Sequence, residues 1–225
     1  MTASNIQKYK KENIVVLSNS IIDSSNLPIM EKTEIGEKFI SSLDAQRIFY
    51  FAINKISQAK REDKESIFDK DIFISVDEIV KATNLTRDRL YTIMKKAAQA
   101  LQSSFIESYH PGDILKKNFT FTALVTQCKY ESEGNAGIYV SLNPKLKDFL
   151  IIDSNFTQLS LQSLVRLNTK YSLKLYSYLK SQRDKYSHKN EIEVTLEKLR
   201  FLLFTNKIKE YNNYPSLRTL RFSDG

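Results

Sequence analysis

A group of cationic and hydrogen-bonding side chains lies at the start of one predicted helix, in the segment TRDRLYTIMKK at residues 86–96. Thr86 can cap the helix or bind a phosphate. Arg87 and Arg89 carry planar guanidinium groups, which suit phosphate oxygens and guanine edges. Single surface cations are common, so an ordinary solvated helix face is the alternative interpretation. The same candidate set includes Tyr91, Lys95 and Lys96.

Similar side chains recur in three other segments. One group opens a predicted helix and alternates away from its apolar face, as phosphate contacts would. A second group belongs to a predicted hairpin, where the side chains could be wing contacts and solvated faces are an equal alternative. A third group follows a tyrosine-rich turn, where another helix is expected to start. The first group is Lys170, Ser172 and Lys174, the second is Lys116, Lys117 and Lys129, and the third is Ser216, Arg218 and Arg221.

Motifs for catalysis, metal binding or nucleotide binding are missing from the sequence. The two histidines, His110 and His188, lie far apart and form no His-x-His pair. The close glycines Gly134 and Gly137 lack the Gly-Lys-Ser/Thr ending of a phosphate-binding loop, and EGNAG is typical of a hairpin turn. A single cysteine, Cys128, excludes an internal disulfide and a zinc site built from several thiolates. We therefore expect no enzyme activity, no metal and no cofactor.

The composition favours a soluble protein with an anionic partner. The 225 residues include 34 Lys and Arg against 26 Asp and Glu, a net charge of +8. This excess suits nucleic acid or a membrane surface and does not choose between them. Apolar runs stay far below the ~20 residues that span a bilayer, so we expect a cytoplasmic protein with no membrane partner. The length fits one large or two small domains.

The elements around residues 86–96 predict a winged helix. Apolar spacing predicts a helix over residues 41–57, which Ser42 or Asp44 can cap, and alternation predicts a strand over residues 71–75. Ser75 and Glu78 have the spacing of a capping box, and a tight turn before Thr86 joins the two helices of a helix-turn-helix. The strand-like segments FTFTALVTQCKY and GIYVSL flank the EGNAG turn and predict a long hairpin. This order spans about residues 41–150, preceded by an arm at residues 1–40.

The same order begins again at Thr169. A helix with Tyr171, Leu175, Tyr178 and Leu179 on one face is followed by a polar loop and a short strand. These lead to a second hydroxyl-capped helix start, and residues 194–199 match residues 74–79 in residue type. Little length then remains for a third helix and a hairpin before residue 225. The sequence therefore predicts an α+β protein with tandem winged-helix domains. Residues 151–225 are expected to form a linker and a second domain that is truncated at its C-terminus.

Several segments together resemble the plasmid replication initiators of the Rep_3 type. They are SLDAQ at residues 42–46, TRDRLY, TKYSLKLY at residues 169–176, VTLEKLRFLL and YNNYPSLR. The resemblance covers about residues 18–217. It implies tandem winged helices that bind directly repeated origin sites, called iterons, in double-stranded DNA. It further implies a monomer active in initiation and a homodimer that represses its own gene. The family continues after YNNYPSLR with a recognition helix and a hairpin, and LRFSDG fits neither.

Three functions follow from these patterns. The first is a sequence-specific, non-enzymatic replication initiator that binds iterons. The second is a repressor that uses the same winged helices. The third is a dimerising interaction or regulatory protein, which binds host replication proteins or its own copy and has impaired iteron binding because the second recognition helix is missing. A truly absent second recognition helix would favour the third over the first.

Overall fold

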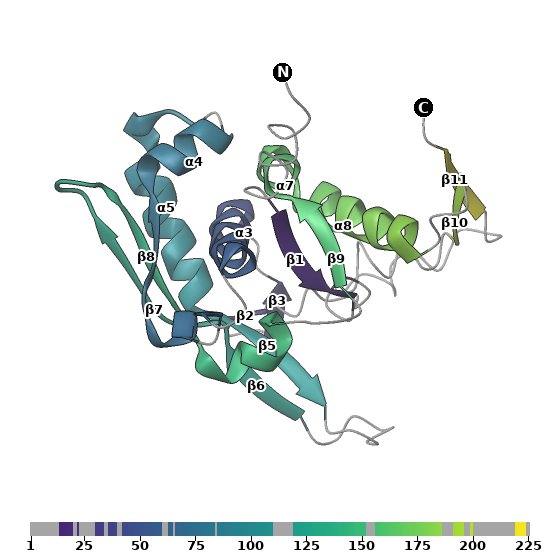
Figure 1. Ribbon diagram of the computed structural model, residues 1–225, viewed down its shortest axis with the longest axis horizontal. Coiled ribbons are helices and arrows are strands. Elements are labelled where there is room, and N and C mark those ends of the chain that lie inside the picture. The colour runs from purple at the N-terminus through teal and green to yellow at the C-terminus, as the bar shows by residue number, and fades with distance from the viewer. Residues whose placement is uncertain are drawn as a thin grey trace.

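A computed structural model describes residues 14–19, 22, 30–33, 36–39, 42–59, 63–64, 66–83, 85–109, 119–151, 156–185, 191–195, 199 and 219–223. Helices alternate with short antiparallel sheets along this part of the chain, so the fold is α+β as predicted. Helix α3 (Leu43–Gln58) lies between strand β1 (Ile14–Ser18) and helix α5 (Arg87–Gln102), and it packs against both (Figure 1). No helix in the described ranges is long and apolar enough to cross a membrane.

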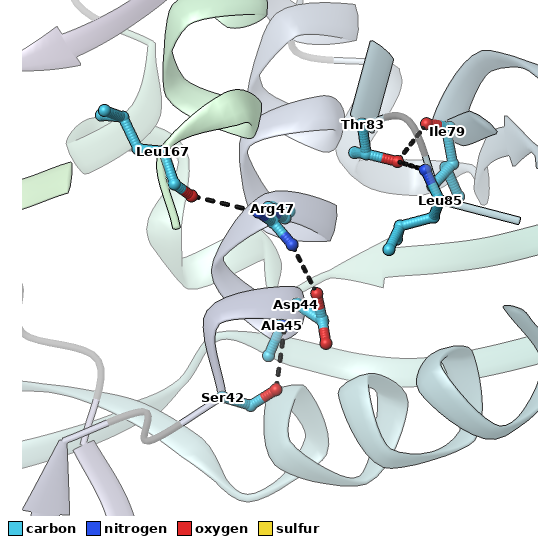
Figure 2. A network of polar contacts seen from close by, with 8 residues as sticks. All are labelled: Ser42, Asp44, Ala45, Arg47, Ile79, Thr83, Leu85 and Leu167. Atoms are coloured by element: carbon cyan, nitrogen blue, oxygen red, sulfur yellow. Dashed lines mark hydrogen bonds and ion pairs between the residues drawn. The ribbon is translucent and has the colours of Figure 1, made fainter. Parts of the chain in front are cut away.

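Helix α3 begins close to the predicted position and uses one of the two predicted caps. The Ser42 hydroxyl accepts a hydrogen bond of 3.2 Å from the Ala45 N–H (Figure 2). Asp44, the other predicted cap, lies in the first turn and pairs with Arg47. Its charge suits the positive end of the helix dipole. The helix is buried along most of its length, which is why it forms the centre of the core.

Strand β4 (Ile72–Ser75) leads directly into helix α4 (Val76–Thr83) through the predicted capping box. The Ser75 hydroxyl accepts a hydrogen bond of 3.1 Å from the Glu78 N–H. In return, the Glu78 carboxylate accepts one of 3.0 Å from the Ser75 N–H. These reciprocal bonds satisfy two backbone donors that a helix start otherwise leaves unpaired.

The end of α4 is held by its own side chains before α5 begins. Thr83 donates a hydrogen bond of 2.6 Å to the Ile79 carbonyl oxygen, and its hydroxyl accepts one of 3.4 Å from the Leu85 N–H (Figure 2). Helix α5 then buries one apolar stripe, including Leu90 and Met94, against the core. The two helices confirm the predicted helix-turn-helix.

The predicted hairpin forms the wing. Strands β7 (Val125–Glu131) and β8 (Gly137–Leu142) pair antiparallel, and β8 also pairs with β4 in a sheet of order β4-β8-β7. Gly134 in the connecting turn has a φ of 65°, a left-handed conformation that glycine adopts at little cost. Three short helices flank these strands: η2 (Ser66–Asp69), η3 (Pro144–Leu146) and α6 (Lys147–Leu150).

One strand prediction is wrong, because the segment FTFTALVTQCKY divides between two sheets. Strand β6 (Phe119–Ala123) pairs with strand β5 (Ser104–Tyr109), not with the wing. The break falls at Leu124, which is fully buried. Its N–H donates to the Ser104 carbonyl oxygen at 2.9 Å, and its carbonyl oxygen accepts from the Asn143 N–H at 3.0 Å. The main chain of Leu124 is thus hydrogen-bonded on both sides of the break. Before it the chain pairs with β5, and after it the chain pairs with β8.

The segment interpreted as an arm, residues 1–40, supplies strands to two sheets. Strand β1 pairs antiparallel with β9 (Phe156–Ser160). Strands β2 (Met30–Thr33) and β3 (Gly36–Phe39) form a hairpin, and β2 also pairs with β5, which gives a sheet of order β3-β2-β5-β6. Sequence analysis missed β1 because its partner β9 lies far away along the chain, and it also missed the local hairpin of β2 and β3.

Strand β1 is attached to α3 by polar contacts. The Asn54 amide donates a hydrogen bond of 2.7 Å to the Ile14 carbonyl oxygen. The Ser57 hydroxyl accepts one of 3.1 Å from the Val16 N–H. Leu17 is buried between these elements. The first described strand is therefore part of the core.

Helices α7 (Leu161–Arg166) and α8 (Lys170–Lys185) follow β9, and α7 packs against α3 and α4. The apolar face of α8 differs from the prediction, which placed Tyr171 beside Tyr178. Tyr178 is buried as predicted, but Tyr171 is 41% exposed and Leu173 is fully buried. The buried stripe of α8 follows Leu173, Ser177 and Ser181, each four residues apart, as one face of a helix requires.

The last described strands correct a second prediction. Strand β10 (Glu191–Thr195) pairs antiparallel with β11 (Thr219–Ser223). Arg221, predicted near the start of a recognition helix, lies instead in β11, opposite Glu193 in the register. The segment TLRFS alternates the apolar residues Leu220 and Phe222 with polar ones, which favours a strand. The helix predicted after Thr195 lies almost wholly outside the described residues.

Candidate nucleic-acid interface

Helix α5 exposes the predicted polar residues to solvent. Its buried stripe faces α3 and the wing, so the opposite side is directed to solvent. Thr86 is the N-cap residue, and its side chain makes no capping hydrogen bond with any described residue. The exposed set contains all six residues predicted in this helix: Thr86, Arg87, Arg89, Tyr91, Lys95 and Lys96.

Arg87 has a partner on the neighbouring helix. Its guanidinium donates to the Asp77 carboxylate, and the two side chains are 70% and 72% exposed. Asp77 lies in the first turn of α4, ten residues earlier in the chain. This ion pair joins the two helices of the helix-turn-helix on the exposed side of the motif.

The neighbouring carboxylate, Glu78, is held differently. Besides its bonds to Ser75, it accepts a hydrogen bond from the Lys55 ammonium group on α3. Partial burial alone would raise the pKa of Glu78, but the hydrogen bonds from Lys55 and Ser75 outweigh it and hold that pKa below its usual value. Glu78 therefore supports the fold, whereas Asp77 faces the candidate interface.

A groove lies between α5 and the wing strand β7. Its volume is about 600 Å³. Tyr91 is 57% exposed and meets Tyr130 of β7 edge to face, with ring centroids 5.6 Å apart. Lys95 and Cys128 line the same groove. An aromatic and basic groove beside a recognition helix suits the sugars and phosphates of a nucleic-acid backbone.

The predicted wing contact Lys129 is exposed and ion-paired. Its ammonium group lies 2.5 Å from the Glu131 carboxylate and 5.8 Å from the centre of the Tyr139 ring. The hydrogen bond and charge of Glu131 raise the pKa of Lys129, and Lys129 in turn lowers the pKa of Glu131. The wing thus carries a cation whose charge is largely balanced within the protein.

The candidates on α8 have structural partners. Thr169 and Ser172 cap the helix start reciprocally: the Thr169 hydroxyl accepts from the Ser172 N–H at 3.0 Å, and the Ser172 hydroxyl accepts from the Thr169 N–H at 3.3 Å. Lys174 is half-buried and also interacts within the protein. Lys170 is the first residue of α8. The predicted residues Lys116, Lys117, Ser216 and Arg218 lie outside the described part of the chain.

The structure brings six predicted residues together on α5, with Lys129 on the adjacent wing. It adds Asp77 and Glu131, the acidic partners that sequence reasoning missed. Glu131 could have been found, because residues two apart in a strand share a face with Lys129. The pairing of Asp77 with Arg87 depends on the angle between two helices and leaves no local sequence signal. Within the described ranges, no cluster of His, Cys, Asp and Glu could hold a metal ion.

Comparisons with known proteins agree with this geometry. Residues 14–180 match a family model described as "Initiator Replication protein, WH1". An Escherichia coli "Replication initiation protein" is 23% identical over 153 residues, covering 68% of this chain and 45% of that protein's length. The crystal structure of the Pi initiator protein in complex with iteron DNA has the same fold. It aligns with a TM-score of 0.61 at 17% identity, covering 92% of this chain and 78% of that one.

Proposed function

Because the chain belongs to the initiator replication protein family, whose WH1 model it matches over residues 14–180, we propose that it is a sequence-specific DNA-binding replication initiator. Its target would be repeated origin sites, or iterons, in double-stranded DNA, and binding would need no catalytic step of its own. The observation that carries the proposal is that all four cationic side chains of α5, Arg87, Arg89, Lys95 and Lys96, are exposed.

The geometry supports a division of labour between α5 and the wing. In a winged helix, residues at the start of the recognition helix reach base edges in the major groove, whose donor and acceptor pattern differs for each base pair. Arg87 and Arg89 occupy that position on α5. Lys95, Lys96 and the wing residue Lys129 lie where phosphates would pass, and phosphate contacts orient a protein on DNA without reading sequence.

A second DNA-binding unit is the next part of the proposal. Helix α8 and strand β10 repeat the order of α3 and β4, and each of these strands pairs with a later antiparallel strand. We assign residues 41–150 to the core of the first winged helix and residues 151–225 to a linker and part of a second. Lys170, Ser172, Lys174, Ser216, Arg218 and Arg221 are its candidate contacts.

A binding measurement tests this function. The preferred duplex is selected from a random library, and the dissociation constant is measured against salt by fluorescence anisotropy. With about five phosphates contacted, log K should fall against log salt with a slope of roughly −4 to −5. Replacing Lys95 and Lys96 with Ala should reduce that slope by about two units. Lys70→Ala is the control, since Lys70 is exposed next to the end of β4 that lies away from α4. A flat salt response, or failure to select any duplex, would contradict the proposal.

One observation favours self-association as a further role. Strand β6 lies at the edge of its sheet, and Phe121 on it is 45% exposed while packing against Phe105 at 4.7 Å between ring centroids. A homodimer that represses its own gene, or an interaction with host replication proteins, would use such a surface. Sedimentation equilibrium of Phe121→Lys should show a weaker dimer than the parent chain. An unchanged association constant would exclude this face.

A further inference from the structure

The ion pair between Asp77 and Arg87 lies at the exposed junction of α4 and α5. Arg87 is the first residue of α5, and Asp77 is in the first turn of α4. Both side chains are mostly exposed, with 72% and 70% accessibility. Exposed ion pairs add little to stability, because water already solvates both charges well. The arrangement therefore matters more for where the guanidinium points than for holding the fold.

Asp77 differs from the other acidic residue in the same turn. Glu78 is bound to Ser75 and Lys55 and is committed to the core side of α4. Asp77 faces the opposite, solvent side, and its Oδ1 accepts one N–H of the Arg87 Nη2. Guanidinium has five N–H donors in a rigid plane, so one such contact leaves enough donors for a bidentate bond to a base.

We propose that Asp77 is a specificity-determining positioning residue that aims Arg87 at a base edge; this rests on the proposed DNA-binding function. Asp77 fixes the plane of the guanidinium before DNA arrives, so less side-chain freedom is lost on binding. Its carboxylate also balances the charge of Arg87 and repels phosphates. Arg87 then adds little to the affinity for random DNA. At a site without a suitable base acceptor, the repulsion between the Asp77 carboxylate and the phosphates is not offset by a bond from Arg87.

The wing provides a matched comparison. Glu131 also pairs with a cation, Lys129, and the side chains of both residues are partly exposed. In a winged helix this strand approaches the DNA backbone, whereas bases are contacted by the recognition helix. Glu131→Gln removes the same charge as Asp77→Asn, so the two variants separate charge from position.

The experiment compares base preference among variants at one salt concentration. After the preferred duplex is selected, a panel in which every base pair is substituted in turn is measured for the parent chain, Arg87→Ala, Asp77→Asn, Asp77→Glu and Glu131→Gln. Arg87→Ala should lose discrimination at one base-pair position by about five- to a hundredfold. Asp77→Asn should reduce discrimination at that same base-pair position by about two- to tenfold, and it should bind random duplex more tightly. In the Arg87→Ala background it should cause no further loss of discrimination.

Two variants keep the result interpretable. Asp77→Glu retains the charge but displaces it by one methylene, so discrimination should fall while affinity for random duplex stays constant. Glu131→Gln should tighten binding to all duplexes alike. If Asp77→Asn behaves as Glu131→Gln does, or if Asp77→Glu retains full discrimination, the positioning role is wrong although DNA binding stands. If the parent chain itself shows no base preference, the proposed function fails as well.

Discussion

The guanidinium of Arg47 on α3 donates a hydrogen bond of 3.0 Å to the main-chain carbonyl oxygen of Leu167, which lies 120 residues further along the chain (Figure 2). The same side chain pairs with Asp44 at 2.9 Å and is only 11% exposed. Leu167 is the C-cap residue of α7, where helix carbonyl groups lack intrahelical partners. Arg47 therefore joins the central helix to the connection between α7 and α8.

Replacing Arg47 with Met should lower the free energy of unfolding by about 1.5–3 kcal/mol, because a part-buried hydrogen bond from a charged group to the Leu167 carbonyl oxygen is lost. Urea unfolding measures the change. Lys180→Met is the matched control, since Lys180 forms a more exposed pair with Asp184 within α8. It should change the free energy by less than about 0.5 kcal/mol. Equal effects of the two variants would contradict a structural role for Arg47.

Glu78 predicts how stability depends on pH. Its pKa is lowered in the folded protein because the bonds from Lys55 and Ser75 outweigh the effect of burial. A group with a lowered pKa stabilises the fold above its unfolded pKa, near 4.3, and this contribution is lost as pH falls through the folded value. Unfolding by urea between pH 7 and pH 3 should therefore show a smaller loss of stability for Glu78→Gln than for the parent chain. Parallel curves for the two proteins would show that Glu78 does not contribute.

Gly137 is expected to tolerate no side chain. It lies opposite Ser75 in the sheet, and an added Cβ would be 2.7 Å from the Ile74 carbonyl oxygen and would also overlap the Phe73 ring. Gly137→Ala should destabilise the protein by about 1–3 kcal/mol, as overpacking does. Gly134→Asn is the control, because space is open there and Asn accepts a left-handed φ. Thermal unfolding that shifts equally for both variants would argue against the close approach.

Cys128 should be an unreactive thiol. Burial raises its pKa to about 12, and the thiolate is the reactive form. At pH 8 the native protein should react with a disulfide reagent roughly a thousandfold more slowly than the chain unfolded in urea. Because the sequence has one cysteine, the absorbance signal reports this site alone. Cys128→Ser gives the background, and similar native and unfolded rates would contradict the burial of the sulfur.

Local signals explain which elements could be predicted from sequence. The capping box at Ser75 and Glu78 and the apolar stripe through Leu90 and Met94 each lie within a few residues, so the helix-turn-helix could be located. Arg87 lies three and seven residues before Leu90 and Met94, in phase with the buried stripe, and it is exposed because it is the first residue of α5.

The predictions that were wrong concern features that depend on contacts between distant parts of the chain or on an analogy between repeats. The partner change at Leu124 depends on a bond to Ser104, twenty positions away, and no local pattern marks it. The exposed position of Tyr171 follows from how α8 packs, and large aromatic residues resemble core residues by type alone. The segment containing Arg221 was interpreted by analogy with the first repeat, although its alternation of residue types favoured a strand.

The pairing of β1 with β9 has a consequence for how the chain folds during synthesis. The buried hydrogen bond between Asn19 and Thr157 spans 138 residues, so the first strand emerges long before its partner exists. At ribosomal rates of about 5–20 residues per second, this delay is roughly seven to thirty seconds. Such distant pairings slow folding, because the entropy of loop closure is lost before the stabilising contacts form. The apolar strand IVVLS therefore spends that interval without its sheet partner β9.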